Sequence, residues 1–518
     1  MVRDSWRARA RRPREALAAA ALAATAAVLA TAVLATAGAG SSVATGGPKG
    51  DRRPAGQNVA GQNVAGQNVA AAEPFSILLS RRSFSLPPST AQCVADYGVR
   101  CYSPAQIQTA YEMLPLYAKG DDGRGETIVV VDSFGSPTIR ADLAAFDRGF
   151  DLPPPPSFRI VAPAGPLPPW TGGGVQSGWG VETSLDVEWA HAMAPGAALV
   201  LVETPVAETE GTVGFPQIIA AERWAILHLD PAVISQSFGA TEQTFPSRQA
   251  IYRLRGAYQL AEKRHVTVLA SSGDAGATSQ KSDSVQYYTF RVVSWPSSDP
   301  LVTSVGGTRL DLSASGKRLS PDTVWNDSAA LRAPAASGGG VSSVFPRPAW
   351  QARVARVVGA RRGVPDVSLS AAESAGALVY MSFHGAPPGY SVVGGTSWAS
   401  PLFSGIVAIA DQVAGRHLGL LNPALYALAD RSSNGIVDIA TGNNTVSFFQ
   451  GNSVHTVVGY RATKGYDLAS GLGTVDGAEL VEALAASAPI LREHPRHKPE
   501  RAVEPRPASK SLQDFFTR

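Results

Sequence analysis

Short apolar runs that alternate with helical patterns constrain the fold of this chain more than any other feature. The apolar runs are Thr127–Val131, Ala198–Val202, Ala232–Ser235 and Val266–Ala270. The helical patterns are Thr183–Ala194, Phe215–Leu227 and Gln249–Lys263. Each apolar run has the length and composition of a buried β-strand. The succession predicts an α/β fold with a mostly parallel central sheet and helices on both faces, whose functional residues lie at the carboxyl ends of its strands.

Composition limits the size of the core and the kind of partner. Of the 518 residues, 44% are hydrophobic and only 17% are charged, which is enough apolar material for a large core. The formal net charge of +3 is close to neutral for this length, so we expect no nucleic-acid binding. Because no assembly signal is visible, a monomer is the default expectation.

The N-terminus has the layout of a secretory signal peptide. Several arginines precede an uncharged, alanine-rich run over residues 16–37, and Ala35–Ala39 offers A-x-A cleavage sites. We therefore interpret residues 1–39 as a signal peptide and expect a secreted protein. The alternative is an uncleaved anchor with the protein outside the cytoplasm, because the run is long enough to span a bilayer.

The remaining segments divide the chain into a linker, one folded domain and a tail. Residues 40–92 contain three copies of Gly-Gln-Asn-Val-Ala and are interpreted as a low-complexity linker, and the Pro- and Arg-rich residues 489–518 as a disordered tail. The folded domain is expected over residues 93–488. Cys93 and Cys101 are the only cysteines, and in an oxidising compartment they predict a short disulfide loop.

Ser397 is the strongest candidate for a nucleophile. It lies in the octet Gly394–Pro401, whose glycines permit a tight turn, and an apolar run of helical character follows over residues 402–410. A serine here sits at a helix N-terminus and faces the positive end of the dipole. An ordinary N-cap serine is the competing interpretation of the same pattern.

A serine nucleophile needs a base, and two sets of residues compete for that role. A subtilase triad would use Asp132, His191 and Ser397, but His191 is not followed by the Gly-Thr that normally follows the subtilase histidine. Glu182 and Asp186 are spaced i, i+4 and so share one helix face. At about 3.6 residues per turn, His191 lies roughly 180° round the helix from Glu182. A like-charged pair on a solvated helix face remains the alternative interpretation.

Asp274 is a third candidate carboxyl group. The buried run that ends at Ala270 continues into Ser271-Ser272-Gly273-Asp274, so the aspartate follows a strand in a glycine-flanked turn. Such a carboxyl group often caps the turn. If it stays protonated, it can instead donate a hydrogen bond to a developing oxyanion.

The order Glu182, Asp186, Asp274, Ser397 with these flanking residues resembles the sedolisin (serine-carboxyl peptidase) family. Further matching segments are Trp295–Pro300, Val305–Thr308, Ser337–Gly340 and Arg362–Ser368, and the resemblance covers about residues 103–480. It implies a subtilisin-like fold with a mostly parallel sheet of about seven strands.

The same resemblance implies an endopeptidase that acts on proteins and peptides. Ser397 would attack the peptide carbonyl, and Glu182 would serve as general base, oriented by Asp186. Asp274 would donate to the oxyanion beside the backbone N–H of Ser397. A carboxylate base and a protonated aspartate both imply activity in acid.

The family resemblance also implies one structural Ca²⁺ ion. Two glycine-rich segments, Val437–Asn444 and Gly465–Gly473, resemble the family's calcium loops. The implied ligands are the carboxylates of Asp438 and Asp467 and the backbone carbonyls of Ile439, Thr463 and Gly465, a set of hard oxygen donors. Thr463 stands where the family commonly has glycine, but only its carbonyl would be used.

Two features leave other interpretations open. The family usually carries a large folded prodomain, whereas only about 55–60 mostly low-complexity residues separate the predicted signal peptide from the catalytic region here. The resemblance therefore implies either unaided folding or help from a partner. An exported, non-catalytic wall or binding protein on a peptidase scaffold is the rival from another functional class.

Overall fold

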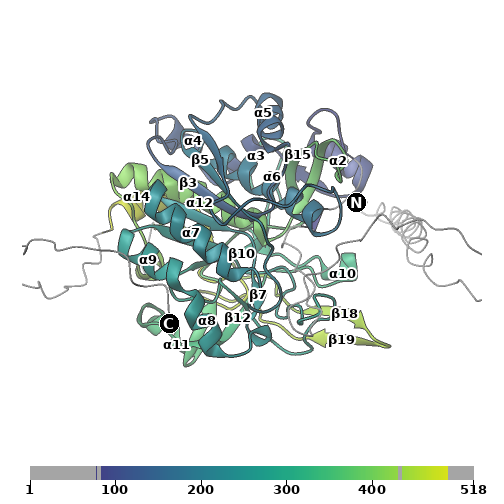
Figure 1. The fold of residues 1–518 in the computed structure, drawn as a ribbon, viewed down its shortest axis with the longest axis vertical. Coiled ribbons are helices and arrows are strands. Elements are labelled where there is room, and N and C mark those ends of the chain that lie inside the picture. The colour runs from purple at the N-terminus through teal and green to yellow at the C-terminus, as the bar shows by residue number, and fades with distance from the viewer. Residues whose placement is uncertain (1–76, 79–82, 430–433, 488–518) are drawn as a thin grey trace, which may run out of the picture. The chain divides into compact units, whose positions relative to one another are not determined.

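The computed structural model describes residues 77–78, 83–429 and 434–487. Its main sheet has eight strands in the order β11-β10-β8-β6-β3-β5-β4, with β14 also paired to β10. Figure 1 labels β3, β5 and β10 of this sheet. Their bounds are β3 Thr127–Ser133, β4 Phe158–Val161, β5 Ala198–Thr204, β6 Val233–Gln236, β8 Thr267–Ser271, β10 Thr303–Arg309, β11 Thr323–Val324 and β14 Val367–Ser370. Of these strands, only β11 runs antiparallel to its neighbour. The predicted subtilisin-like, mostly parallel sheet is confirmed.

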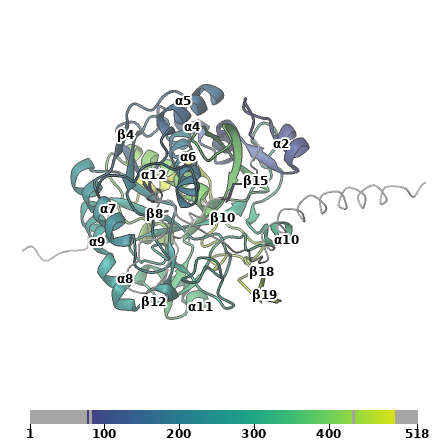
Figure 2. The same ribbon diagram turned by 45° about the vertical axis from the view of Figure 1, so that its right-hand side comes forward.

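The strands at the centre of the sheet, such as β3, have continuous apolar stretches because both faces of the sheet are covered. In β3, Ile128 and Val130 pack into one core and Val129 and Val131 into the other. The first core includes helices α6 (Val175–Met193) and α12 (Thr396–Ala414), and the second includes α7 (Phe215–Leu229) and α9 (Gly256–Arg264) (Figure 2). Burial on two faces removes the polar alternation that a strand with one wet face would show.

The smaller elements complete the fold. The helical ones are α2 Thr90–Tyr97, α3 Pro104–Ala110, α4 Leu114–Tyr117, α5 Ile139–Phe150, η1 Glu242–Thr244, α8 Arg248–Leu254, α10 Ser328–Leu331, η2 Ala349–Val354, α11 Ala355–Val358, α13 Asn422–Leu428 and α14 Gly477–Ala485. The remaining strands are β1 Ile77–Leu78, β2 Arg100–Tyr102, β7 Ala240–Thr241, β9 Ser294–Trp295, β12 Gly340–Pro346, β13 Arg361–Val364, β15 Ala375–Met381, β16 Gly389–Gly394, β17 Ile436–Val437, β18 Val446–Gln450, β19 Ser453–Val457 and β20 Thr474–Val475.

Two of the three predicted helices differ from the structure. The helix expected over Gln249–Lys263 is split into α8 and α9 at Arg255, whose guanidinium binds both oxygens of the buried Asp299 carboxylate. The weak helix former Gly256 follows directly, which lowers the cost of the break. Helix α6 begins at Val175, eight positions before the predicted start, because glycines in its first turns weaken the helical signal there. Helix α7 matches its prediction closely.

The ordered structure also begins earlier than the predicted boundary at residue 93. Strand β1 pairs with β16, and Phe84 forms a bridge with Tyr390, so both belong to the body of the domain. A two-residue strand and a single bridge leave no periodic pattern in the sequence. The predicted signal peptide, most of the linker with its repeats, and the C-terminal tail lie outside the described residues.

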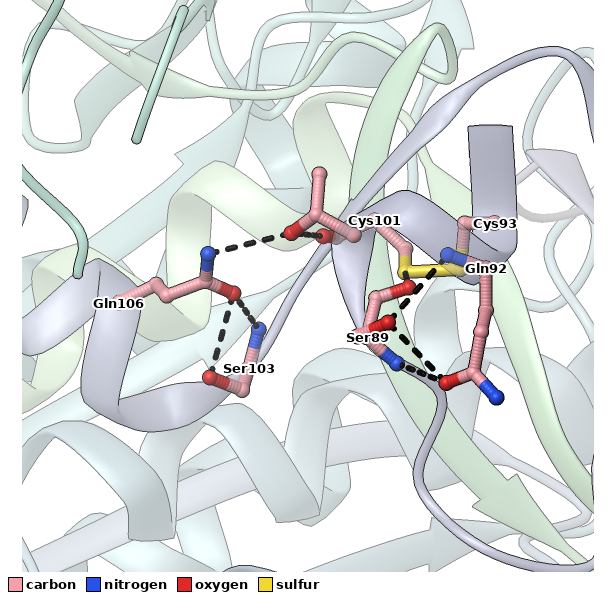
Figure 3. Close-up of a disulfide and its surroundings, with 7 residues drawn as sticks. Ser89, Gln92, Cys93, Cys101, Ser103 and Gln106 are labelled. Carbon is pink, nitrogen blue, oxygen red and sulfur yellow. Dashed lines mark hydrogen bonds between the residues drawn. A yellow bond between two sulfur atoms is a disulfide. The ribbon is translucent and has the colours of Figure 1, made fainter. Parts of the chain in front are cut away.

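The predicted disulfide is present. Cys93 in α2 and Cys101 in β2 are bonded, and both are buried (Figure 3). Capping boxes begin the helices on either side: Ser89 with Gln92 starts α2, and Ser103 with Gln106 starts α3. The disulfide ties the start of the domain to the sheet that contains β15 and β16, since β2 pairs with β15.

No helix in the described part of the chain is both long and apolar enough to cross a membrane. The alanine-rich run over residues 16–37 lies outside the described residues.

A buried ion pair gives a stability prediction. Arg362 and Asp366 are both fully buried, with the guanidinium Nη2 2.5 Å from a carboxylate oxygen. Asp366→Ala would leave Arg362 charged and unpaired in the core, so we expect the free energy of unfolding to fall by about 3–5 kcal/mol. Denaturant unfolding measures this change. Lys119→Met breaks the exposed pair with Glu482 and should leave the midpoint unchanged; an equal loss in both variants would contradict the prediction.

Candidate active site

Three neighbouring strands deliver polar side chains to the same edge of the sheet. Asp132 lies near the end of β3, Ser237 directly follows β6, and Asp274 lies shortly after β8. Since β3, β6 and β8 are adjacent and parallel, their carboxyl ends meet at one edge. This is the edge at which parallel α/β sheets carry their functional residues.

Helix α6 adds two carboxyl groups at this edge. Glu182 and Asp186 are fully buried, and the helix packs against β3 and α12. Burial is the main cause that raises the pKa of Asp186 well above its usual range, and the charges of Asp132 and Glu182 raise it further. The pKa of Asp132 is raised in the same way, first by burial and then by the charge of Glu182. The carboxyl groups of Asp132, Glu182 and Asp186 therefore form one electrostatic cluster, in which the three are not all ionised at once.

Asp274 makes its contacts through one oxygen. Its Oδ1 accepts hydrogen bonds from the backbone N–H of Thr396 at 2.8 Å and from the Thr396 hydroxyl at 2.6 Å. Its Oδ2 is buried and has no hydrogen-bond partner among the described residues. Burial raises the pKa of Asp274 well above its usual range, although the Thr396 hydrogen bonds lower it. A protonated Asp274 would thus carry its proton on Oδ2, the oxygen that is still available to donate.

Ser397 is the second residue of α12. It directly follows Thr396, which binds Asp274, and it is linked to Asp186 through Ser237. Gly395 precedes the helix with φ +116°, a backbone conformation that a residue with a Cβ rarely adopts. The Ser397 Oγ is buried and has no hydrogen-bond partner in the described part of the chain. Ser237 links the serine to α6, because its hydroxyl lies 3.0 Å from Asp186 Oδ1 and 3.3 Å from the Ser397 carbonyl.

His191 lies apart from this group. Its Nε2 is 2.8 Å from the Pro153 carbonyl and 3.3 Å from Asp147 Oδ1, and its ring is fully buried. Burial lowers the pKa of His191 to about 4, so the ring is neutral over most of the pH range. The subtilase triad that the sequence left open therefore lacks its histidine at the edge where Asp132 lies.

The residues of the implied calcium site come together. The backbone N–H of Gly465 donates to Asp438 Oδ2 at 3.0 Å, and that of Thr463 donates to Asp467 Oδ2 at 2.9 Å. The carbonyls of Ile439, Thr463 and Gly465 accept no hydrogen bond from any described residue. This site offers only two carboxylates, and no three His, Cys, Asp or Glu side chains come together as metal ligands anywhere in the described residues. The donor set fits an oxygen-ligated cation.

Sequence reasoning missed three contributors to the site. Ser237 and Thr396 have short polar side chains, and their hydrogen bonds to Asp186 and Asp274 depend on contacts between distant segments. Asp132 entered the sequence analysis only as a member of a histidine triad. Its place near the end of the first buried strand was the available signal, because that edge collects functional residues.

Comparison with known proteins agrees with this geometry. The model of the subtilase family matches residues 180–452. Kumamolisin from Bacillus sp. (strain MN-32) is 32% identical over 394 residues, which cover 75% of this chain and 64% of kumamolisin. Sedolisin from Pseudomonas sp. (strain 101) is 34% identical over 215 residues, 41% of this chain and 34% of that protein. The solved structure of Pseudomonas sedolisin, a serine-carboxyl proteinase in complex with pseudo-iodotyrostatin, has a TM-score of 0.59 at 27% identity and covers 74% of this chain and 98% of its own.

The chain belongs to the subtilase family. The similarity to kumamolisin and to sedolisin confirms the resemblance to the sedolisin family found in the sequence. The chain spans about 64% of the length of kumamolisin.

Proposed function

We propose that this protein is a secreted, acid-acting serine-carboxyl endopeptidase that cleaves proteins and peptides through an acyl-enzyme on Ser397. The observation that carries the proposal is the pairing of Asp274 with Thr396 directly beside Ser397, at the edge where Asp132, Glu182 and Asp186 form a buried acid cluster. Secretion is supported by the predicted signal peptide and by the disulfide.

In the proposed acylation step, the Ser397 Oγ attacks the substrate carbonyl carbon and Glu182 takes the hydroxyl proton. Asp186 orients Glu182 and stabilises the protonated pair. The Ser237 hydroxyl donates to the Asp186 carboxylate and fixes its position. The carbonyl π electrons move to oxygen, and the protonated Asp274 Oδ2 and the Ser397 N–H stabilise the oxyanion. Glu182 then gives the proton to the leaving amine as the C–N bond breaks.

Deacylation repeats these transfers with water. Glu182 removes a proton from the water that attacks the ester carbonyl, and the proton returns to Ser397 Oγ as the acyl product leaves. Each proton taken is therefore returned within one cycle. Because Asp274 donates only while protonated, activity is expected to fade as the pH rises toward neutrality.

Hydrolysis of denatured haemoglobin or casein tests the function. The purified protein should release peptides at about pH 4 and lose most of this activity near neutrality, whereas Ser397→Ala should be inactive. Activity that peaks above pH 8, or equal activity in the Ser397→Ala variant, would contradict the proposal.

The calcium site is proposed as a structural element. The carboxylates of Asp438 and Asp467 and the carbonyls of Ile439, Thr463 and Gly465 would hold one Ca²⁺, whose charge would offset the two carboxylates and join the two loops. We expect chelator to lower the Tm and added Ca²⁺ to restore it, with Asp438→Asn weakening the response. Thermal unfolding at matched ionic strength measures this effect, and a Tm unchanged by chelator would exclude the site.

A further inference from the structure

A second pair of acidic groups lies behind the segment that leads to Ser397. Glu373 lies between β14 and β15, and Asp327 lies just before α10. The indole N–H of Trp325 donates to both of them, at 2.8 Å to Glu373 Oε2 and at 3.2 Å to Asp327 Oδ2. Glu373 and Trp325 are 1% and 0% exposed, and Asp327 is buried as well. Two carboxyl oxygens that accept from one N–H must lie close together.

Nothing in the described part of the chain neutralises two charges at this place. No Lys, Arg or His there forms an ion pair with Glu373 or Asp327. The backbone N–H and hydroxyl of Ser374 donate to Asp327, so both oxygens of that carboxyl group already accept hydrogen bonds. Adjacent buried carboxyl groups without a cation are stable when they share one proton. Because Asp327 accepts the two hydrogen bonds from Ser374, Glu373 carries the shared proton.

The pair is in contact with the backbone before Ser397. A Cβ on Gly394 would lie 2.7 Å from Glu373 Cγ, so the glutamate packs directly against that glycine. Trp325 and Thr396 both flank Gly307: a Cβ on Gly307 would lie 2.7 Å from the indole Cε3 and 3.4 Å from the Thr396 methyl group. Glu373 thus packs against Gly394, and the indole that binds Glu373 lies across Gly307 from Thr396.

We propose that Glu373 and Asp327 are positioning residues that share one proton and, through Trp325 and Gly394, hold the turn that places Ser397. The kinetic part of this inference rests on the proposed function, whereas the shared proton does not. Burial raises the pKa of Glu373 most, followed by its hydrogen bond to Asp327, and the charge of Asp274 adds to the shift. Loss of the shared proton would leave two carboxylates facing each other and would disturb the turn.

Kinetics of two substitutions test the positioning role. Glu373→Ala should lower kcat about 100-fold at pH 4 with KM changed by less than about threefold, because a small displacement of a catalytic group costs about that much. Glu373→Gln keeps an acceptor for Trp325 and a donor for Asp327, so it should restore kcat to within about threefold of the wild type. A kcat in Glu373→Ala within threefold of the wild type, or no rescue by Gln, would overturn the positioning role.

The indole N–H signal of Trp325, assigned with Trp325→Phe in selectively ¹⁵N-labelled protein, tests the shared proton without any assay of activity. In the Ser397→Ala protein the chemical shift of this signal should change with pH, with a midpoint above about 4.3, the ordinary pKa of glutamate. The titration should vanish in Glu373→Gln and persist in the matched control Glu222→Gln, another buried glutamate that faces the other core. A signal that does not titrate would overturn the shared proton, even if the protein is an active peptidase. An inactive wild type with a titrating signal would instead refute only the proposed function.

Discussion

Glu182→Gln is expected to lower kcat on the order of 10⁴-fold at acid pH, because the substitution removes the base that activates Ser397. The amide has nearly the same shape and buried volume, so the fold and KM should change little. Glu182 is fully buried, and its charge is among the causes that raise the pKa of Asp132, Asp186 and Asp274. The charge of Glu182 thus acts on each of the other three acidic residues of the site.

His191→Gln is the matched control for this substitution. The new side chain would sit on the same helix, α6, and its amide N–H can donate to the Pro153 carbonyl that now contacts the ring. We expect kcat to stay within about threefold of the wild type, since no catalytic contact is lost. Steady-state kinetics on a peptide substrate distinguishes the two cases. A larger loss in His191→Gln than in Glu182→Gln would favour a histidine-based subtilase mechanism.

The second large effect is a loss of stability as the pH rises. The domain buries many carboxyl groups whose folded pKa exceeds the unfolded value; burial raises the pKa of Asp411 and Glu210 to about 8 and that of Glu203 to about 7. Such groups bind more protons in the folded state, so their contribution is fully present below the unfolded pKa near pH 4 and is lost as the pH rises through the folded value. We expect a Tm about 10 °C lower at pH 8 than at pH 4.

Groups that make the folded state more stable as the pH rises contribute less. The pKa of His191 is lowered to about 4, so this residue costs stability as the pH falls below the unfolded value near 6.5. Calorimetry on Ser397→Ala avoids self-digestion during the scan. Glu222→Gln should raise the Tm at pH 8 relative to its parent and change it little at pH 4, because burial alone raises the pKa of Glu222. A Tm that increases from pH 4 to pH 8 would contradict this account.

The main sheet was predictable because its strands are buried on both faces. After its first residue the run Thr127–Val131 is entirely apolar, and helices separate it from the next apolar runs along the chain. The i, i+4 spacing of Glu182 and Asp186 and the rotation of His191 away from them follow from helix geometry alone. Helix α6 has this arrangement, with His191 directed toward Asp147.

Contacts between distant segments could not be predicted in this way. Ser237 reaches Asp186 only because β6 lies next to β3, which packs against α6, and a single serine carries no sign of that. Glu373 and Asp327 lie 46 positions apart, and both accept a hydrogen bond from the Trp325 indole. Arg255 splits a predicted helix because of a partner, Asp299, in another loop. Local patterns define elements, whereas tertiary pairing decides which polar side chains meet.

Trapping of the acyl-enzyme tests the central claim, that Ser397 is a nucleophile activated by carboxylates. The protein is mixed with a peptide ester at about pH 4, quenched in acid, digested and mapped by mass spectrometry. We predict an acyl adduct on the peptide that contains Ser397 in the wild type and in His191→Gln, and its loss in Glu182→Gln and Ser397→Ala. An adduct on another residue, or one that forms in Glu182→Gln but not in His191→Gln, would contradict the account.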